Sequence, residues 1–225
     1  MRSRFVRDNS LSIVFGLLFL AALVGQSIAG YYDENELLAA HDEPSISYGS
    51  YLLSSSFGVE MLENWQSEYL QFAFYIFATI WLFQRGSNES KVEADLGLET
   101  DEKQRVGRQA DSRSPRWARR KDWRYHLYAN SLLLVMAVIF VGSWLGQSLT
   151  GWTNYNDELE QHGQGTISWI SYLGRGEFWE RTLSNWQSEF LAVGTMAVFT
   201  IYLRQRGSPE SKPVGAPHGE TGSSG

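Results

Sequence analysis

The sequence predicts an all-α integral membrane protein with four transmembrane helices, arranged as two tandem hairpins that point the same way. Three observations lead to this fold class. Residues 9–91 and 130–212 align without a gap at an offset of 121 and agree at about 35 of 83 positions. Each copy contains two long apolar stretches, and Lys and Arg concentrate outside and between the copies. A repeat of this length indicates a duplicated structural unit.

Four apolar stretches define the expected spans. A helix of nineteen residues covers roughly 28 Å, close to the hydrocarbon thickness of a bilayer. The predicted spans are residues 11–29, 65–83, 132–150 and 186–203. The domains that follow are a first hairpin at 1–91, a charged linker at 92–127, a second hairpin at 128–212 and a tail at 213–225. The tail is rich in Pro, Gly and Ser and is expected to be disordered.

The first apolar stretch has an alternative interpretation as a cleaved signal peptide. Arginines precede it, and it ends in Ser27-Ile28-Ala29, which resembles a cleavage site. The second copy, however, carries Ser148-Leu149-Thr150 at the end of an internal stretch that cannot be an N-terminal signal. We therefore expect the first stretch to remain as a span.

Basic residues orient the spans, because short cytoplasmic loops retain Lys and Arg. Eleven Lys and Arg lie from Arg85 to Arg124, whereas residues 30–64 contain none and residues 151–185 contain two. Both termini and the linker are therefore expected to be cytoplasmic. The two hairpins then form a parallel repeat, related by an axis along the membrane normal.

The linker has an acidic half, which is expected to be disordered, and a basic half from Arg105 to Arg124. Trp117 and Trp123 are interleaved with the basic residues. This pattern, beside a span, predicts binding to anionic lipid at the membrane surface. A nucleic-acid patch is the less favoured alternative.

Each outer loop is about 35 residues long and is expected to have structure of its own. Apolar and aromatic residues recur there every three to five positions, which predicts a short amphipathic helix before the second span of each copy. At the other end of that span, Gly86 and Gly207 in the Gln-Arg-Gly-Ser block are expected to take a left-handed conformation that ends the helix.

The pentapeptide Asn-Trp-Gln-Ser-Glu is identical in both copies. Its asparagines, Asn64 and Asn185, are expected to cap the helices of the second and fourth spans. Its tryptophans, Trp65 and Trp186, suit the membrane interface.

Polar residues near the outer ends of the spans suggest a further site. We hypothesise that amides and carboxylates from both copies converge in a polar, acidic vestibule able to bind a cation or a proton. Its members are Gln26, Gln66, Glu68, Gln147, Gln187 and Glu189. Structural hydrogen bonds between helices are the alternative role for the amides. Small residues beside them are expected to let helices pack closely, namely Ala21, Gly25, Gly142 and Gly146.

Other chemistry has little support in the sequence. No cysteine is present, and no phosphate-binding loop, nucleophile elbow or metalloprotease motif is found. His41 and His162 match across the repeat, but no second ligand repeats nearby, so hydrogen bonding in the loops is favoured over metal or haem ligation or pH sensing. No catalytic residue, metal or cofactor is predicted.

With its doubled hairpin, repeated Gly-Gln-Ser and Asn-Trp-Gln-Ser-Glu blocks and Gln-Arg-Gly-Ser endings, the chain resembles a family of uncharacterised small bacterial four-span membrane proteins, known as a domain of unknown function. The resemblance extends from Asn9 to Lys212 and implies a location in the bacterial inner membrane. We expect a non-enzymatic structural or interaction protein of the envelope. The alternative is a small transporter or channel using the vestibule, for which a homo-oligomer could supply the pore.

Overall fold

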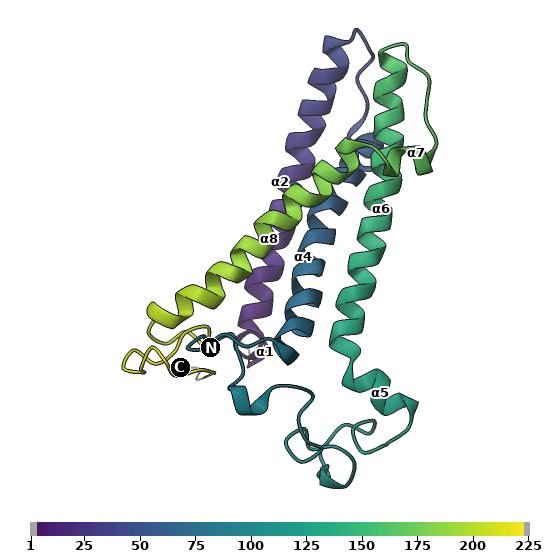
Figure 1. Ribbon diagram of the computed structural model, residues 1–225. Helices are drawn as coiled ribbons and strands as arrows, with labels where there is room; N and C mark the ends of the chain where they lie inside the picture. The colour runs from purple at the N-terminus through teal and green to yellow at the C-terminus, as the bar shows by residue number, and fades with distance from the viewer. Residues whose placement is uncertain (1–3, 223–225) are drawn as a thin grey trace. The chain divides into compact units, whose positions relative to one another are not determined.

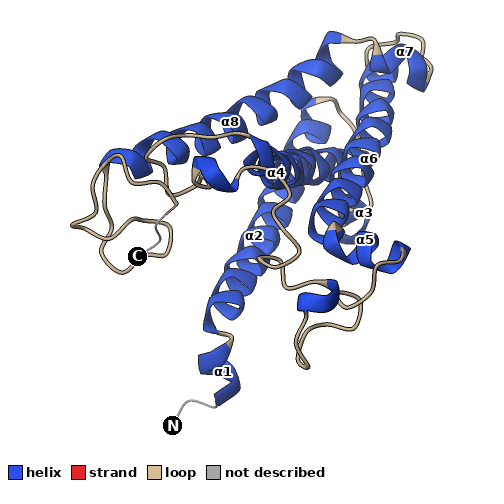
Figure 2. Ribbon diagram, turned by 60° about the horizontal axis from the view of Figure 1, so that its bottom comes forward, coloured by secondary structure: helices blue, strands red, loops and turns tan. Residues whose placement is uncertain are grey.

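The computed structural model describes residues 4–222, and within that range the protein consists of helices joined by turns, with no strand (Figures 1 and 2). The linker contains two short 3-10 helices, at Glu93–Asp95 and Gly107–Gln109. The α-helices are α1 (Arg4–Asp8), α2 (Ser10–Ala40), α3 (Tyr48–Leu52), α4 (Ser55–Trp81), α5 (Trp123–Ala129), α6 (Ser131–Gln161), α7 (Trp169–Leu173) and α8 (Gly176–Tyr202). The prediction of an all-helical protein is confirmed.

The helix boundaries follow the offset seen in the sequence. Helices α6, α7 and α8 begin and end 121 residues after α2, α3 and α4, so the paired helices have equal lengths of 31, 5 and 27 residues. The short helices α3 and α7 fall in the loops between the long helices of each copy, where the sequence predicts short helices. The same order of long, short and long helix therefore occurs in both halves of the chain.

Two of the described helices, α2 and α6, are long and apolar enough to cross a membrane. Only 6% of the most apolar stretch of α2 is buried, and 17% of that of α6, so neither is covered like the core helix of a soluble protein. The other two predicted spans, 65–83 and 186–203, lie largely on α4 and α8. These two helices are not among the described helices that are long and apolar enough to cross a membrane. Those two spans stay predictions.

The described chain forms two compact units. The first runs up to Met61 and includes Ser148–Ile167, and the second combines Leu62–Gln147 with the chain from Ser168 onwards. Helices α4 and α6 each pass from one unit into the other. The two units are described separately below.

In the first unit, side chains of the long helices hold the loops that follow them. The side-chain oxygen of Asn35 accepts a hydrogen bond from the Ile46 amide at 2.8 Å, and that of Asn156 accepts one from the Ile167 amide at the same distance. Ser27 of α2 is buried and bonds to the Tyr48 hydroxyl at 2.6 Å. The equivalent asparagines thus fix equivalent loops.

A close contact in the first unit requires a glycine. A Cβ added at Gly30 of α2 would lie 2.0 Å from the hydroxyl oxygen of Tyr51, which is 1% exposed. Burial and, next, the charge of Glu60 raise the pKa of Tyr51 to about 12. Because the hydroxyl lies against bare backbone, Gly30 lets α3 approach α2 closely.

The second unit contains two copies of one turn, after α4 and after α8. Gly86 and Gly207 both have φ of 84°, the left-handed conformation that the sequence predicts for them. In each turn, the backbone amide of the glutamine donates a hydrogen bond to the serine six residues after it. The Gln84 amide donates to the Ser90 hydroxyl at 3.0 Å, and the Gln205 amide donates to the Ser211 hydroxyl at 2.9 Å. Helices α4 and α8 already end at Trp81 and Tyr202, five residues before these glycines. The left-handed conformation is therefore confirmed, but the predicted role of the glycines in ending the helices is wrong: the Gln-Arg-Gly-Ser block forms a turn beyond each helix.

Candidate functional site

A buried amide joins α4 to α8 in the second unit. Gln66 is 0% exposed, and its side-chain oxygen accepts a hydrogen bond from the indole N–H of Trp186 at 2.7 Å. Its side-chain nitrogen donates to the Glu63 carbonyl at 3.1 Å. The repeated pentapeptides of the two copies thus meet through one glutamine and one tryptophan. The two hydrogen bonds together satisfy both the oxygen and the nitrogen of the buried Gln66 amide.

Trp186 belongs to an aromatic cluster centred on Trp144 of α6. The Trp144 ring stacks with Phe140 and Phe178 at centroid distances of 5.9 and 6.0 Å, and lies 5.9 Å from the Trp186 ring. Its indole N–H donates to the hydroxyl of the buried Thr182 at 3.4 Å. Offset aromatic contacts of this kind hold large rings in fixed orientations. The cluster therefore positions the tryptophan that bonds Gln66.

An ion pair lies one turn away from the buried amide. Arg181 of α8 contacts the Glu63 carboxylate at 3.3 Å and the Glu177 carboxylate at 3.4 Å. Burial raises the pKa of Glu63, and the charge of Arg181 opposes that shift. Burial also lowers the pKa of Arg181, but the Glu63 charge reverses the effect and leaves that pKa raised. Glu63 precedes the predicted span 65–83.

Replacing Arg181 by Met is expected to destabilise the protein more at neutral pH than at acid pH. Without the cation, the pKa of Glu63 rises further above its ordinary value of 4.5. A carboxyl whose pKa is raised by folding weakens the folded state as the pH rises from the ordinary pKa through the raised one. Thermal unfolding in detergent at about pH 4 and about pH 7 measures the difference.

The control for this measurement is the same substitution in a Glu63→Gln background. With no carboxyl left to titrate at position 63, the loss caused by Arg181→Met should be the same at both pH values. A pH-independent loss in the presence of Glu63 would contradict the predicted coupling.

Two glutamates of the predicted vestibule are neighbours in the second unit. Glu68 is exposed and Glu189 is half-buried, and each lies within electrostatic range of the other, with Ser67 beside them. Because they come from equivalent positions of the two pentapeptides, their negative charges add at one place between α4 and α8.

The remaining vestibule residues have different surroundings. Gln147 is 1% exposed in the second unit, whereas Gln187, the counterpart of Gln66, is exposed. Gln26 is half-buried on α2 in the first unit. Within the second unit, the structure thus brings Glu68 and Glu189 near each other, places Gln66 in its separate contact with Trp186 and leaves Gln187 on the surface.

The predicted capping role of Asn64 and Asn185 is wrong. Helices α4 and α8 begin nine residues earlier, at Ser55 and Gly176, so both asparagines lie inside a helix. The hydroxyl of Ser54 accepts from the Phe57 amide at 3.2 Å at the true start of α4, and Asn185 donates to the Arg181 carbonyl. The apolar pattern of the outer loop continues without a break into the predicted span, which is why the helix starts earlier.

The small residues expected at helix contacts are only partly used. A Cβ at Gly146 would lie 2.8 Å from a methyl carbon of Leu62, so α6 lies close to α4 there. Cβ atoms at Gly25 and Gly142 would meet no atom within 4 Å in their own units. Ala21 is exposed. The small residues of the pattern therefore do not form one continuous contact.

A buried lysine at the end of the second copy has no signature in the sequence. Lys212 is 1% exposed, and four backbone carbonyls lie within hydrogen-bond distance of its ammonium group, sharing its three N–H donors. The shortest, at 2.6 Å, goes to Gly86, in the turn of the first copy. The others go to Pro217, His218 and Glu220 at 3.0–3.2 Å. We call this group the carbonyl cage; it holds the tail against the turn after α4.

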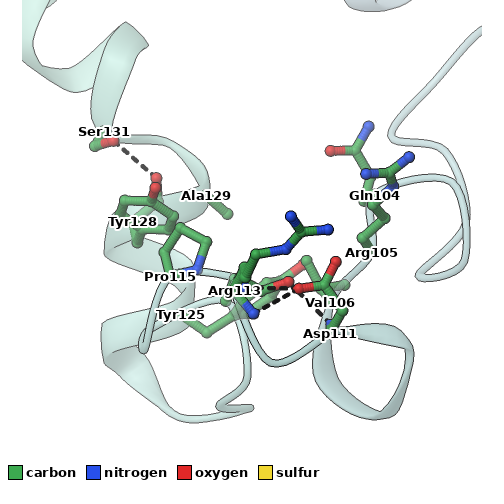
Figure 3. Close-up of a pocket in the computed structure, with 12 residues that line it drawn as sticks. Gln104, Arg105, Val106, Asp111, Arg113, Pro115, Tyr125, Tyr128, Ala129 and Ser131 are labelled. Carbon is green, nitrogen blue, oxygen red and sulfur yellow. Dashed lines mark hydrogen bonds between the residues drawn. The ribbon is translucent and has the colours of Figure 1, made fainter.

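The basic half of the linker and the start of α6 line an open pocket of about 670 Å³ (Figure 3). Arg105 and Arg113 contribute to its wall, together with Tyr125 and Tyr128. Asp111 accepts from the backbone amides of Arg113 and Ser114, which shapes the turn on one side. The wall therefore combines cationic and aromatic side chains.

These features define a helical protein with two helices that could cross a membrane and a polar contact between α4 and α8. The chain belongs to the DUF6766 family, a domain of unknown function, whose model matches residues 2–223. No curated protein and no solved structure shows significant similarity to the chain.

Proposed function

We propose that the chain is a four-span protein of the bacterial inner membrane, built from two tandem hairpins with both termini in the cytoplasm. The equal lengths and constant offset of the paired helices support the duplication. The apolar character of α2 and α6 supports membrane insertion, and the distribution of Lys and Arg supports the orientation. On this proposal α4 and α8 supply the second span of each hairpin.

We further propose that the role is non-enzymatic, as a structural or interaction protein of the cell envelope. The observation that carries this is the internal pairing of the polar groups between α4 and α8. Gln66 bonds to Trp186, and Glu63 bonds to Arg181. Groups paired in this way hold helices together and are not free to bind a substrate. Apolar side chains along α2 remain exposed, a surface that lipid or a partner helix would cover.

The linker fits a role at the membrane surface. Trp117 and Trp123 are exposed, the guanidinium of Arg124 lies 5.5 Å from the Trp123 ring, and Arg105 and Arg113 line the linker pocket. Cationic and aromatic groups together suit anionic lipid headgroups. On this proposal the segment from Arg105 to Arg124 binds the inner leaflet.

A small transporter or channel is the second candidate function. One observation favours it: Glu68 and Glu189 lie near each other, and paired carboxylates of this kind can bind a cation or a proton. A homo-oligomer would add further copies of this pair around a pore.

Proteoliposome flux measurements separate the two functions. The purified protein is reconstituted, and proton and monovalent-cation movement is recorded with and without the Glu68→Gln and Glu189→Gln substitutions. Absence of flux above protein-free vesicles is the result expected for a structural protein. Flux that the double substitution abolishes would overturn the leading proposal and establish the transporter.

A further inference from the structure

The rings of two histidines lie close together in the first unit, nearly at right angles to each other. His41 directly follows α2, and His162 directly follows α6, at positions 121 residues apart. Their ring centroids are 6.3 Å apart with an angle of 76° between the planes, and both side chains are exposed. The ends of two long helices thus present a pair of imidazoles to the same space.

The backbone sets which nitrogen of each ring is free. The Nδ1 atom of His41 lies 2.9 Å from the Leu37 carbonyl, and that of His162 lies 2.8 Å from the Glu158 carbonyl. A carbonyl oxygen can only accept, so Nδ1 carries the proton of the neutral ring and Nε2 keeps its lone pair. Metal-binding histidines commonly show this arrangement, in which the other ring N–H donates to a backbone carbonyl.

The histidines line a cavity of about 700 Å³ with an acidic wall. Acidic side chains around a cavity favour a cation inside it. The carboxylates in the wall are Glu34, Glu43, Asp157, Glu158 and Glu160. Within residues 4–222, no group of three or more histidine, aspartate or glutamate side chains is already placed so that it could hold one metal ion. The imidazoles therefore offer two nitrogen ligands, and water would complete the coordination.

The distance between the rings suits one shared ion. With Zn–N bonds of about 2.0–2.1 Å, two imidazoles on one ion have centroids roughly 5–6 Å apart. The observed centroid distance of 6.3 Å lies just beyond that range, and both side chains are exposed. Imidazole nitrogen prefers zinc, copper and nickel over magnesium or calcium.

We propose that His41 and His162 form a binding site for a divalent transition-metal ion such as Zn²⁺, at the C-terminal ends of α2 and α6 in the first unit. The site depends on the contact between the two helix ends and not on whether the protein is structural or a transporter.

Isothermal titration of Zn²⁺ into the full-length protein in detergent tests the site. The protein must carry no histidine tag. We expect one Zn²⁺ per chain in the presence of excess Mg²⁺, and a loss of affinity of about tenfold or more in His41→Ala and in His162→Ala. His126→Ala is the matched control, because it removes a histidine outside the pair, and it should bind as the native protein does.

Two outcomes would overturn the proposal. One is the absence of Zn²⁺ binding by the native protein. The other is binding that persists in the His41→Ala/His162→Ala double variant, which would assign the ion to the acidic wall alone. Circular dichroism of each variant without metal separates loss of the site from loss of the fold.

Discussion

Replacing Gln66 by Ala is expected to lower the free energy of unfolding by about 2 kcal/mol, whereas Gln187→Ala should change it by less than about 0.5 kcal/mol. The two glutamines occupy the same position of the same pentapeptide. Gln66 is fully buried and accepts the Trp186 indole N–H, while Gln187 is exposed. Truncating Gln66 leaves that donor without its partner and opens a small cavity; truncating Gln187 does neither.

Chemical or thermal unfolding in detergent, followed by tryptophan fluorescence, measures the difference. Gln187→Ala serves as the matched control, because it makes the same change in the same sequence context. Equal effects of the two substitutions would mean that the Gln66 to Trp186 bond contributes nothing beyond the local helix. A Trp186→Phe variant should lose a similar amount, and adding Gln66→Ala to it should then cost less than in the native protein.

Replacing Lys212 by Met is expected to release the tail and to destabilise its contact with the turn after α4 by about 3 kcal/mol, since four buried or partly buried hydrogen bonds lose their one charged donor. Met keeps much of the length of the side chain, so the loss reports the ammonium group rather than its volume. Hydrogen exchange of the amides of Gly86 and Gly222, which bond to Thr221 and Ser87 across the same contact, should become faster.

Lys91 provides the comparison for this experiment. It occupies the equivalent position of the first copy, but its ammonium donates to one carbonyl, of Gly97, and pairs with Glu99 at 2.8 Å in a partly exposed position. Lys91→Met should therefore change exchange and stability little. Unchanged protection of the tail in Lys212→Met would show that the carbonyl cage does not hold it.

Local patterns predicted the parts of the fold that depend on local sequence. The apolar periodicity predicted long helices, and the Gln-Arg-Gly-Ser block predicted the left-handed glycines at 86 and 207. Asn64 was misassigned because a capping residue inside an unbroken helical pattern looks the same as one at its start. Ser54, which does cap α4, carried the better signal, since an extended segment and a short helix precede it.

The site depended on contacts that no local pattern contains. Identical pentapeptides place Gln66 in a dry contact and Gln187 on the surface, so the difference must come from neighbours distant in sequence. Trp144 is one such neighbour, and the equivalent residue of the first copy is Leu23. The carbonyl cage likewise leaves no pattern in the sequence, because its acceptors are backbone atoms, which every residue type carries.

The unequal surroundings of Gln66 and Gln187 bear on the consequence of having two copies of one segment in a single polypeptide. If two identical segments associated as separate subunits about a twofold axis, equivalent glutamines would have the same environment, so both would be buried or both exposed. Joining them in a single gene frees every position to mutate independently of its twin. One copy can then carry an indole, at Trp144, where the other carries an aliphatic side chain, at Leu23.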